Sequence, residues 1–187
     1  KISKEAASIA DEKKKTLSTS RDSAETLKQI QTASESLKSS ADQLTNTGKD
    51  SVFSKSQDEI YKAVDSFVTN YNKLIEGSAK SASDSITKRV DTLKNMTESN
   101  QKLLGQAGIT IGKDDTLTLD KDAFAKADAN TVKTLFSGSY SYASRVSSQS
   151  SFIDFAATQE AAKANTYTTK GTYSNTYASG NIFNSYF

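Results

Sequence analysis

Cysteine and histidine are both absent from the 187 residues of this sequence. Without cysteine the chain can form no disulfide bond, no thiolate metal site and no thiol nucleophile. Without histidine it lacks the usual general base near neutral pH and the commonest metal ligand of proteins. We therefore expect a protein that is not an enzyme, and the sequence assigns no catalytic residue, no cofactor and no metal ion.

Long apolar runs are missing as well, because no stretch approaches the roughly 18 consecutive apolar residues of a membrane-spanning helix. The 24 Lys and Arg residues are mixed with the 22 Asp and Glu residues along the chain, and the net charge is only +2. This distribution leaves no basic face of the kind that binds nucleic acid. Neither a nucleic-acid partner nor a membrane span is therefore expected.

Apolar side chains are few but regularly spaced near the start of the chain. Leu27, Ile30, Leu37 and Leu44 follow one another at heptad spacing, which predicts one long helix over residues 3–46. This regularity argues against disorder, the alternative that a Ser-rich and Thr-rich composition suggests. The four residues are candidate interface positions against a second copy or another protein, and they could equally pack inside one chain.

Three further long helices are predicted from the same periodicity. One covers residues 56–76, a second carries apolar residues from Ile86 to Leu104 and ends at Gly105, and the last covers residues 139–165. On the last helix, one apolar side is expected to hold Tyr142, Val146, Phe152, Ile153 and Ala156, broadened by Phe155 and Ala157. Short polar connections between such helices indicate an antiparallel bundle.

The stretch "GITIGKDDTLTLD", residues 108–120, does not have a helical pattern. Apolar and β-branched residues alternate on either side of an acidic turn, which predicts a β-hairpin at about 109–119. Asp120 is expected to cap the short helix that follows. Phe124, Val132, Leu135 and Phe136 are expected to close the end of the bundle.

Paired carboxylates in the same region invite a calcium-loop interpretation. Asp114 and Asp115 are adjacent, and Asp120 and Asp122 follow closely. The Asp-x-Asp-x-Asp-Gly frame and the glutamate at the twelfth position are both missing, so turn formation and helix capping explain these residues better.

The run "GITIGKDDTLTLDKDAFAKADANTVKTLFSG" resembles a pattern near the C-terminal part of flagellar hook-associated protein 2, the filament cap. The upstream segment "VDSFVTNYNKLIE", residues 64–76, is similar to the helix that precedes this element in that family. The matching pieces lie within about residues 56–145. The resemblance implies a structural, self-assembling protein located outside the cell or on a bacterial flagellum, with flagellin-like subunits or further copies as partners.

The chain also departs from that family. The family usually continues into a long C-terminal coiled coil of Leu-rich heptads and often carries large inserted β domains, which this sequence lacks. The residues that follow the match include "SSQSSFIDFAATQEAAKAN" and an aromatic tail. The resemblance therefore implies the stalk region of a filament cap without the plate that covers the filament end.

The segment after residue 165 is rich in tyrosine and phenylalanine and ends in Phe183, Tyr186 and Phe187. It is either a free tail or an extended strap laid on the bundle, and these three residues are further candidate contact positions. The predicted fold is mainly α: an elongated antiparallel bundle or coiled coil over residues 1–165, with one small β-hairpin, and the aromatic tail over residues 166–187.

Two functional hypotheses follow from these patterns. The first is a structural subunit similar to the stalk of a flagellar filament cap. The second is a helical protein-binding module or surface-exposed spacer unrelated to flagella. The cellular location is open between the two, because a cysteine-free chain suits the cytoplasm and the cell exterior equally. The chain begins at Lys1 without an initiator Met, which suggests an excised or processed fragment and leaves an upstream signal peptide open.

Overall fold

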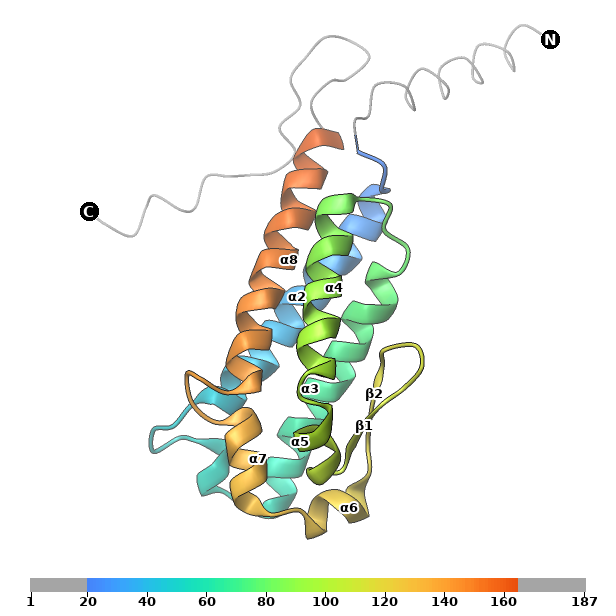
Figure 1. The fold of residues 1–187 in the computed structure, drawn as a ribbon. Coiled ribbons are helices and arrows are strands. Elements are labelled where there is room, and N and C mark those ends of the chain that lie inside the picture. The colour runs from blue at the N-terminus through green and yellow to red at the C-terminus, as the bar shows by residue number, and fades with distance from the viewer. Residues whose placement is uncertain (1–19, 165–187) are drawn as a thin grey trace, which may run out of the picture.

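Four long helices form an antiparallel bundle in the computed structural model, which describes residues 20–164 (Figure 1). They are α2 (Ala24–Thr45), α3 (Gln57–Ser78), α4 (Asp84–Glu98) and α8 (Tyr142–Ala164). The shorter elements are the 3-10 turn η1 (Val52–Ser54), the helices α5 (Gln101–Gln106), α6 (Lys121–Lys126) and α7 (Ala129–Phe136), and the strands β1 (Ile109–Ile111) and β2 (Leu117–Leu119). The predicted class, a mainly helical bundle with one small hairpin, is confirmed.

Local capping explains where several helices begin. Ser56 and Glu59 form a reciprocal capping box at the start of α3, which satisfies amide groups that have no partner inside the helix. The Asp120 carboxylate accepts a hydrogen bond from the Ala123 amide at 2.8 Å, as the sequence predicts for the start of α6. Asp128 begins α7 in the same way.

The helices α2 and α8 form the most extensive contact of the bundle. They run antiparallel, since Gln31 donates to the Thr158 hydroxyl near one end and Ser147 donates to Asp42 near the other. Both helices bury several small residues, and small residues allow helix backbones to approach closely. The buried small residues are Ser34, Ser40 and Ala41 on α2, and Ala143, Ser147, Ser150, Ala156, Ala157 and Ala161 on α8.

The two ends of the bundle differ. Residue 20 and residue 164 lie at the same end, whereas α5, α6 and α7 lie at the other (Figure 1). At that second end Phe67, Phe136 and Tyr142 pack edge to face with centroid distances of 5.5 to 6.4 Å. The predicted closing residues Phe124, Val132, Leu135 and Phe136 are all buried there.

Two predicted helix boundaries are wrong. The first helix does not continue through residues 20–23, because Ser23 caps α2 by accepting a hydrogen bond from the Thr26 amide at 3.1 Å. Residues 3–19 of that prediction lie outside the described residues. The third predicted helix is interrupted at Ser99 and Asn100, so that α4 and α5 are separate, and Gly105 lies inside α5.

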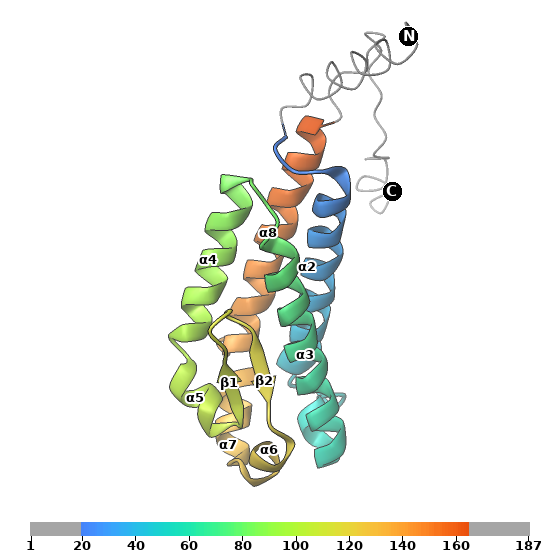
Figure 2. The same cartoon turned by 90° about the vertical axis from the view of Figure 1, so that its right-hand side faces the viewer.

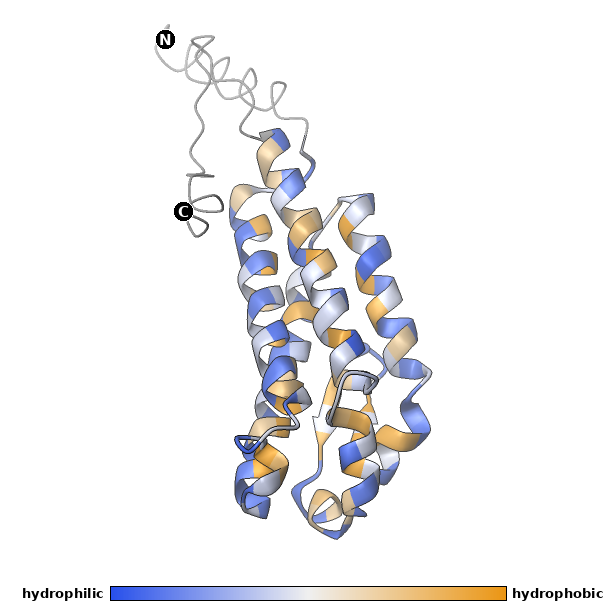
Figure 3. Ribbon diagram, turned by 90° about the vertical axis from the view of Figure 1, so that its left-hand side faces the viewer, coloured by the Kyte–Doolittle hydropathy of each residue, from blue (hydrophilic) through white to orange (hydrophobic). Residues whose placement is uncertain are grey.

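The predicted apolar side of α8 is also partly wrong. Tyr142, Val146, Ile153, Ala156 and Ala157 are buried, as expected. Phe152 and Phe155, however, are 52% and 57% exposed. Hydrophobic and hydrophilic residues alternate along the long helices of the bundle (Figure 3), and α8 differs in carrying large apolar residues on its outer face as well.

Candidate interaction surface

The predicted interface residues of α2 do not lie on the surface. Leu27, Ile30, Leu37 and Leu44 are each 0% exposed and pack against the other helices of the same chain. Of the two predicted alternatives, these four residues therefore pack inside one chain. The other candidate contact residues, Phe183, Tyr186 and Phe187, lie outside the described residues.

The hairpin is attached to α3 by a pair of hydrogen bonds. The Asn72 side-chain amide donates to the Leu117 carbonyl oxygen at 2.8 Å, and its oxygen accepts from the Leu117 amide at 2.7 Å. Ile109 and Leu117 are buried beside this contact, and the strands pair with Ile109 opposite Leu119 and Ile111 opposite Leu117. Figure 2 shows the hairpin lying along α3 and α5. The Asn72 side chain thus links the hairpin to α3 through both backbone groups of Leu117.

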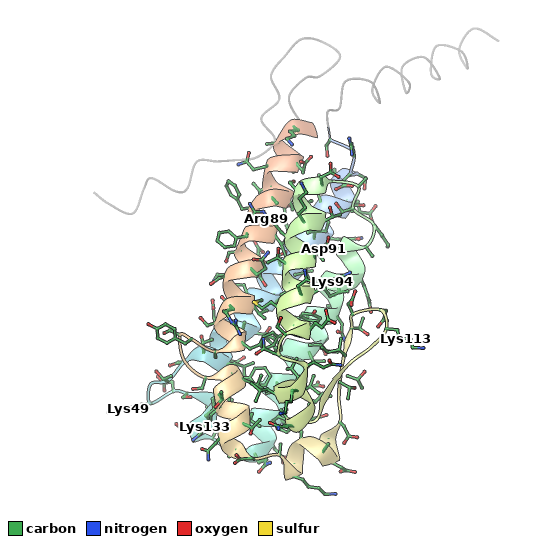
Figure 4. The ribbon with its side chains drawn as sticks, viewed as in Figure 1. Lys49, Arg89, Asp91, Lys94, Lys113 and Lys133 are labelled. Atoms are coloured by element: carbon green, nitrogen blue, oxygen red, sulfur yellow. The ribbon has the colours of Figure 1, made fainter. Side chains whose placement is uncertain are left out.

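The acidic residues around the hairpin are used for turns and caps. Asp114 accepts hydrogen bonds from the Thr116 hydroxyl at 2.7 Å and from the Thr116 amide at 3.2 Å, and these bonds lower the pKa of Asp114. The Asp115 carboxylate lies 3.0 Å from the Lys94 ammonium, an ion pair between the hairpin and α4. Figure 4 shows Lys94 on α4 and Lys113 at the hairpin turn. Across residues 20–164 no three acidic side chains come together in a metal-binding group.

The core contains a cluster of hydroxyl groups that the sequence did not predict. The Thr97 hydroxyl lies 2.8 Å from the Tyr142 hydroxyl, and Thr97 also donates to the Leu93 carbonyl oxygen. Tyr71 is buried near them, and burial raises its pKa to about 12. Burial also raises the pKa of Tyr142. Because both phenols stay protonated at neutral pH, this cluster is not poised for proton transfer.

A polar network holds the end of the bundle at which residues 20 and 164 lie. The Asp22 carboxylate accepts hydrogen bonds from the Ser81 hydroxyl and the Ala82 amide, which ties the start of α2 to the loop between α3 and α4. The Glu160 carboxylate, 9% exposed, accepts from Lys163 at 2.7 Å and from Ser85 at 3.3 Å. These bonds orient the helices, and they leave no activated nucleophile.

A groove of about 670 Å³ lies between α2 and α3 on the same half of the bundle. Its walls carry charges of both signs, with Lys28, Lys73 and Lys80 opposed by Glu25 and Glu76. Mixed charges at the rim of an open groove are typical of a solvated surface, because no single ligand charge is favoured. The groove therefore does not define a site for a particular small molecule.

The outer face of α8 is the most distinctive surface of the described residues. An exposed row runs along it at spacings of three and four: Arg145, Ser148, Phe152, Phe155, Gln159 and Ala162. The Arg89 guanidinium of α4 lies 5.4 Å from the centroid of the Phe152 ring, a cation–π contact at the edge of the row. In Figure 4 Arg89 lies at the boundary between α4 and α8. Between Ser148 and Ala162 the row is uncharged, which is unusual for a solvent-facing helix stripe.

A third large apolar side chain, Tyr140, is 99% exposed in the loop before α8. The three large hydrophobic residues exposed within residues 20–164 are therefore all in the segment 140–155. Sequence periodicity missed this surface, because it assigned Phe152 and Phe155 to the buried side of the helix. The sequence feature from which this surface could have been predicted is the second row of residues at heptad spacing on α8.

The fold and this surface define a class of protein: a helical bundle with a closed core, a β-hairpin clamped to one helix, and an aromatic stripe on another. Within residues 20–164 no helix is both long and apolar enough to cross a membrane. Comparison of the chain with protein-family models, with curated proteins and with solved structures finds no match in any of the three.

Proposed function

We propose that this chain is a non-enzymatic structural protein that acts by packing against protein partners, in a manner similar to the stalk region of a flagellar filament cap. One observation carries the proposal. The two segments that resemble that family, residues 64–76 and the run that starts at Gly108, are separate in sequence but joined by the Asn72 and Leu117 hydrogen bonds. Two local similarities that form one physical unit support the resemblance more strongly than either does alone.

The roles of the aromatic and ionisable side chains in the described residues support the same proposal. The core is closed by packed aromatic rings, the carboxylates serve as caps and ion-pair partners, and the tyrosines of the core are held protonated. A closed bundle of this kind can bind another protein through the shape and the apolar side chains of its surface. The proposal is limited to a stalk-like role, because the sequence after about residue 145 departs from the family pattern.

The proposal includes a cellular location for the protein. A subunit similar to a filament cap would leave the cell and associate with the flagellum or its flagellin-like subunits. An antibody against this chain, applied to the cytoplasm, the culture medium and sheared filaments of the source cell, tests the proposal. Recovery with the filaments is the expected result, and retention in the cytoplasm would contradict it.

A second candidate function is a helical binding module or surface spacer unrelated to flagella. Tyr140 favours it, because a fully exposed tyrosine on a loop can act as an anchor for a partner protein. The mass of the purified chain in solution separates the candidates. A concentration-dependent increase in mass supports the self-assembling subunit, whereas a stable monomer that stays in the cytoplasm supports the binding module.

A further inference from the structure

Apart from the Arg89 guanidinium at its edge, the outer face of α8 has no helix or strand of residues 20–164 packed on it, although it has the residue pattern of a packing face. Phe152 and Phe155 are more than half exposed, and the row from Ser148 to Ala162 repeats the three-and-four spacing of a helix seam. The opposite face of the same helix is buried against α2 and α4. A helix with apolar residues on two opposite faces is typical of one that lies between two layers.

The size of this row indicates what kind of occupant it suits. From Ser148 to Ala162 the row is roughly 20 Å long at 1.5 Å per residue, and one helix width of about 10 Å gives a footprint of roughly 200 Å². A stable complex of separate proteins usually buries about 800 Å² on each partner. A segment of the same chain needs far less contact, because a short tether gives it an effective concentration in the millimolar range.

The chain itself supplies such a segment at the right place. Residues 165–187 continue directly from Ala164, the last described residue of α8. They contain no Asp or Glu and one Lys, and they carry Tyr167, Tyr173, Tyr177, Phe183, Tyr186 and Phe187. A nearly uncharged aromatic segment matches a row that is itself uncharged and centred on two phenylalanines, since aromatic pairs gain energy beyond the area they bury.

The reach of the segment also fits. Phe155 lies nine residues before Ala164, a distance of roughly 14 Å along the helix at 1.5 Å per residue. Ten residues of extended chain span at most about 33–36 Å, so Tyr173 can return to the level of Phe155 after a turn of a few residues. Residues 1–19 fit less well, because they contain no aromatic side chain and carry a charged run, Asp11 to Lys15.

We propose that residues 165–187 fold back along the outer face of α8 and place their tyrosine rings against Phe152 and Phe155. This strap covers the apolar row of the bundle and competes with any partner protein for it. The proposal does not depend on a flagellar role, because it concerns a contact within one chain.

Disulfide trapping tests the proposal cleanly, since the chain has no cysteine of its own. One variant combines Gln159→Cys, on the exposed row, with Ser174→Cys in the strap, so that both phenylalanines stay in place. The matched control combines Thr32→Cys with Ser174→Cys. Thr32 is exposed at nearly the same height of the bundle, as the Gln31 to Thr158 hydrogen bond shows, but it lines the groove between α2 and α3. Non-reducing gels then separate disulfides within one chain from those between chains.

The intramolecular disulfide is expected to form at least about tenfold faster in the Gln159 pair than in the Thr32 pair, the ratio that about 1.4 kcal/mol of docking gives. Adding Phe152→Ser and Phe155→Ser to the Gln159 pair is expected to remove this advantage. Equal rates in the two pairs, or a faster Thr32 pair, would overturn the proposal. A disulfide mainly between chains would assign the face to a second copy. A faster reaction of Gln159→Cys with Ser8→Cys than with Ser174→Cys would assign it to residues 1–19.

Discussion

The side chain of Asn72 on α3 forms both a donor and an acceptor hydrogen bond with the backbone of Leu117 in the hairpin, at 2.8 and 2.7 Å. The two residues are 45 positions apart in the sequence. An amide side chain carries both a donor and an acceptor and can satisfy both backbone groups of one residue, which a carboxylate, with acceptors only, cannot do. The contact therefore attaches Leu117 of the hairpin to α3 through both of its backbone groups.

Replacing this amide with an apolar group should destabilise the fold. In Asn72→Leu both backbone groups of Leu117 lose their partner, and the expected loss in unfolding free energy is about 1–3 kcal/mol. Asn95→Leu is the matched control, because Asn95 is exposed on α4 and the substitution changes helix propensity equally. Urea unfolding of both variants measures the difference, and equal stabilities would show that the Asn72 contact contributes nothing.

Two glycines near the hairpin should respond to alanine in opposite directions. Gly108 has a φ of +76°, and a Cβ at this position would lie 2.6 Å from the Phe124 nitrogen. Gly108→Ala is therefore expected to cost more than about 2 kcal/mol, from left-handed strain of about 1–2 kcal/mol and a backbone clash. Gly105 lies within α5 with open space around it, so Gly105→Ala should stabilise by about 0.5–1 kcal/mol. Thermal unfolding checks both signs, and a stable Gly108→Ala protein would contradict the observed approach of α6.

A substitution at Leu37 distinguishes packing within the chain from packing between chains. Its side chain is fully buried in the seam of α2, so Leu37→Ala should lower the unfolding free energy by about 2–5 kcal/mol. The mass of the folded protein in solution should not change. Ser39→Ala, an exposed change on the same helix, should stay within about 0.5 kcal/mol of the original protein. A change in mass with unaltered stability would instead mean that the seam joins subunits.

Much of the fold could be predicted from the sequence, because its strongest signals are local. The spacing of Leu27, Ile30, Leu37 and Leu44 placed the buried stripe of α2 correctly, and the alternation around residues 109–119 identified the hairpin. Asp120 was recognisable as a cap from its position before an apolar pattern. Each of these features depends on residues within a few turns of one another.

The features that were missed depend on competition between nearby alternatives or on distant contacts. At the end of α4 the side chains of Ser99 and Asn100 donate to the carbonyl oxygens of Asn95 and Met96, which interrupts a helix whose apolar spacing continues. On α8 two rows have heptad spacing, and periodicity alone does not say that the row of Ile153 faces the core while that of Phe152 faces outward. The Asn72 contact with Leu117 has no local signal, because only the folded chain brings the two residues together.

The carboxylate of Glu160 should make stability depend on pH in a defined direction. Burial alone would raise its pKa, but hydrogen bonds from Lys163, Ser83 and Ser85 and the Lys163 charge outweigh burial, so the pKa is lowered from the usual 4.5. A lowered pKa in the folded state means that the charged carboxylate favours folding above about pH 4.5. This contribution is lost as the pH falls through the lowered value, because protonation removes the acceptor charge.

Comparison with a variant that cannot titrate isolates this effect from that of the other acids. Glu160→Gln should be less stable than the original protein at pH 7, and the difference should shrink as the pH falls below about 4.5, as measured by urea unfolding at each pH. Glu98→Gln is the control for the substitution itself, since Glu98 is exposed at the end of α4. Parallel curves for Glu160→Gln and the original protein would mean that the Glu160 carboxylate is not preferentially stabilised by the folded state. Convergence confined to Glu160→Gln is the result expected if this carboxylate, which accepts a hydrogen bond from Ser85, ties α8 to the first turn of α4.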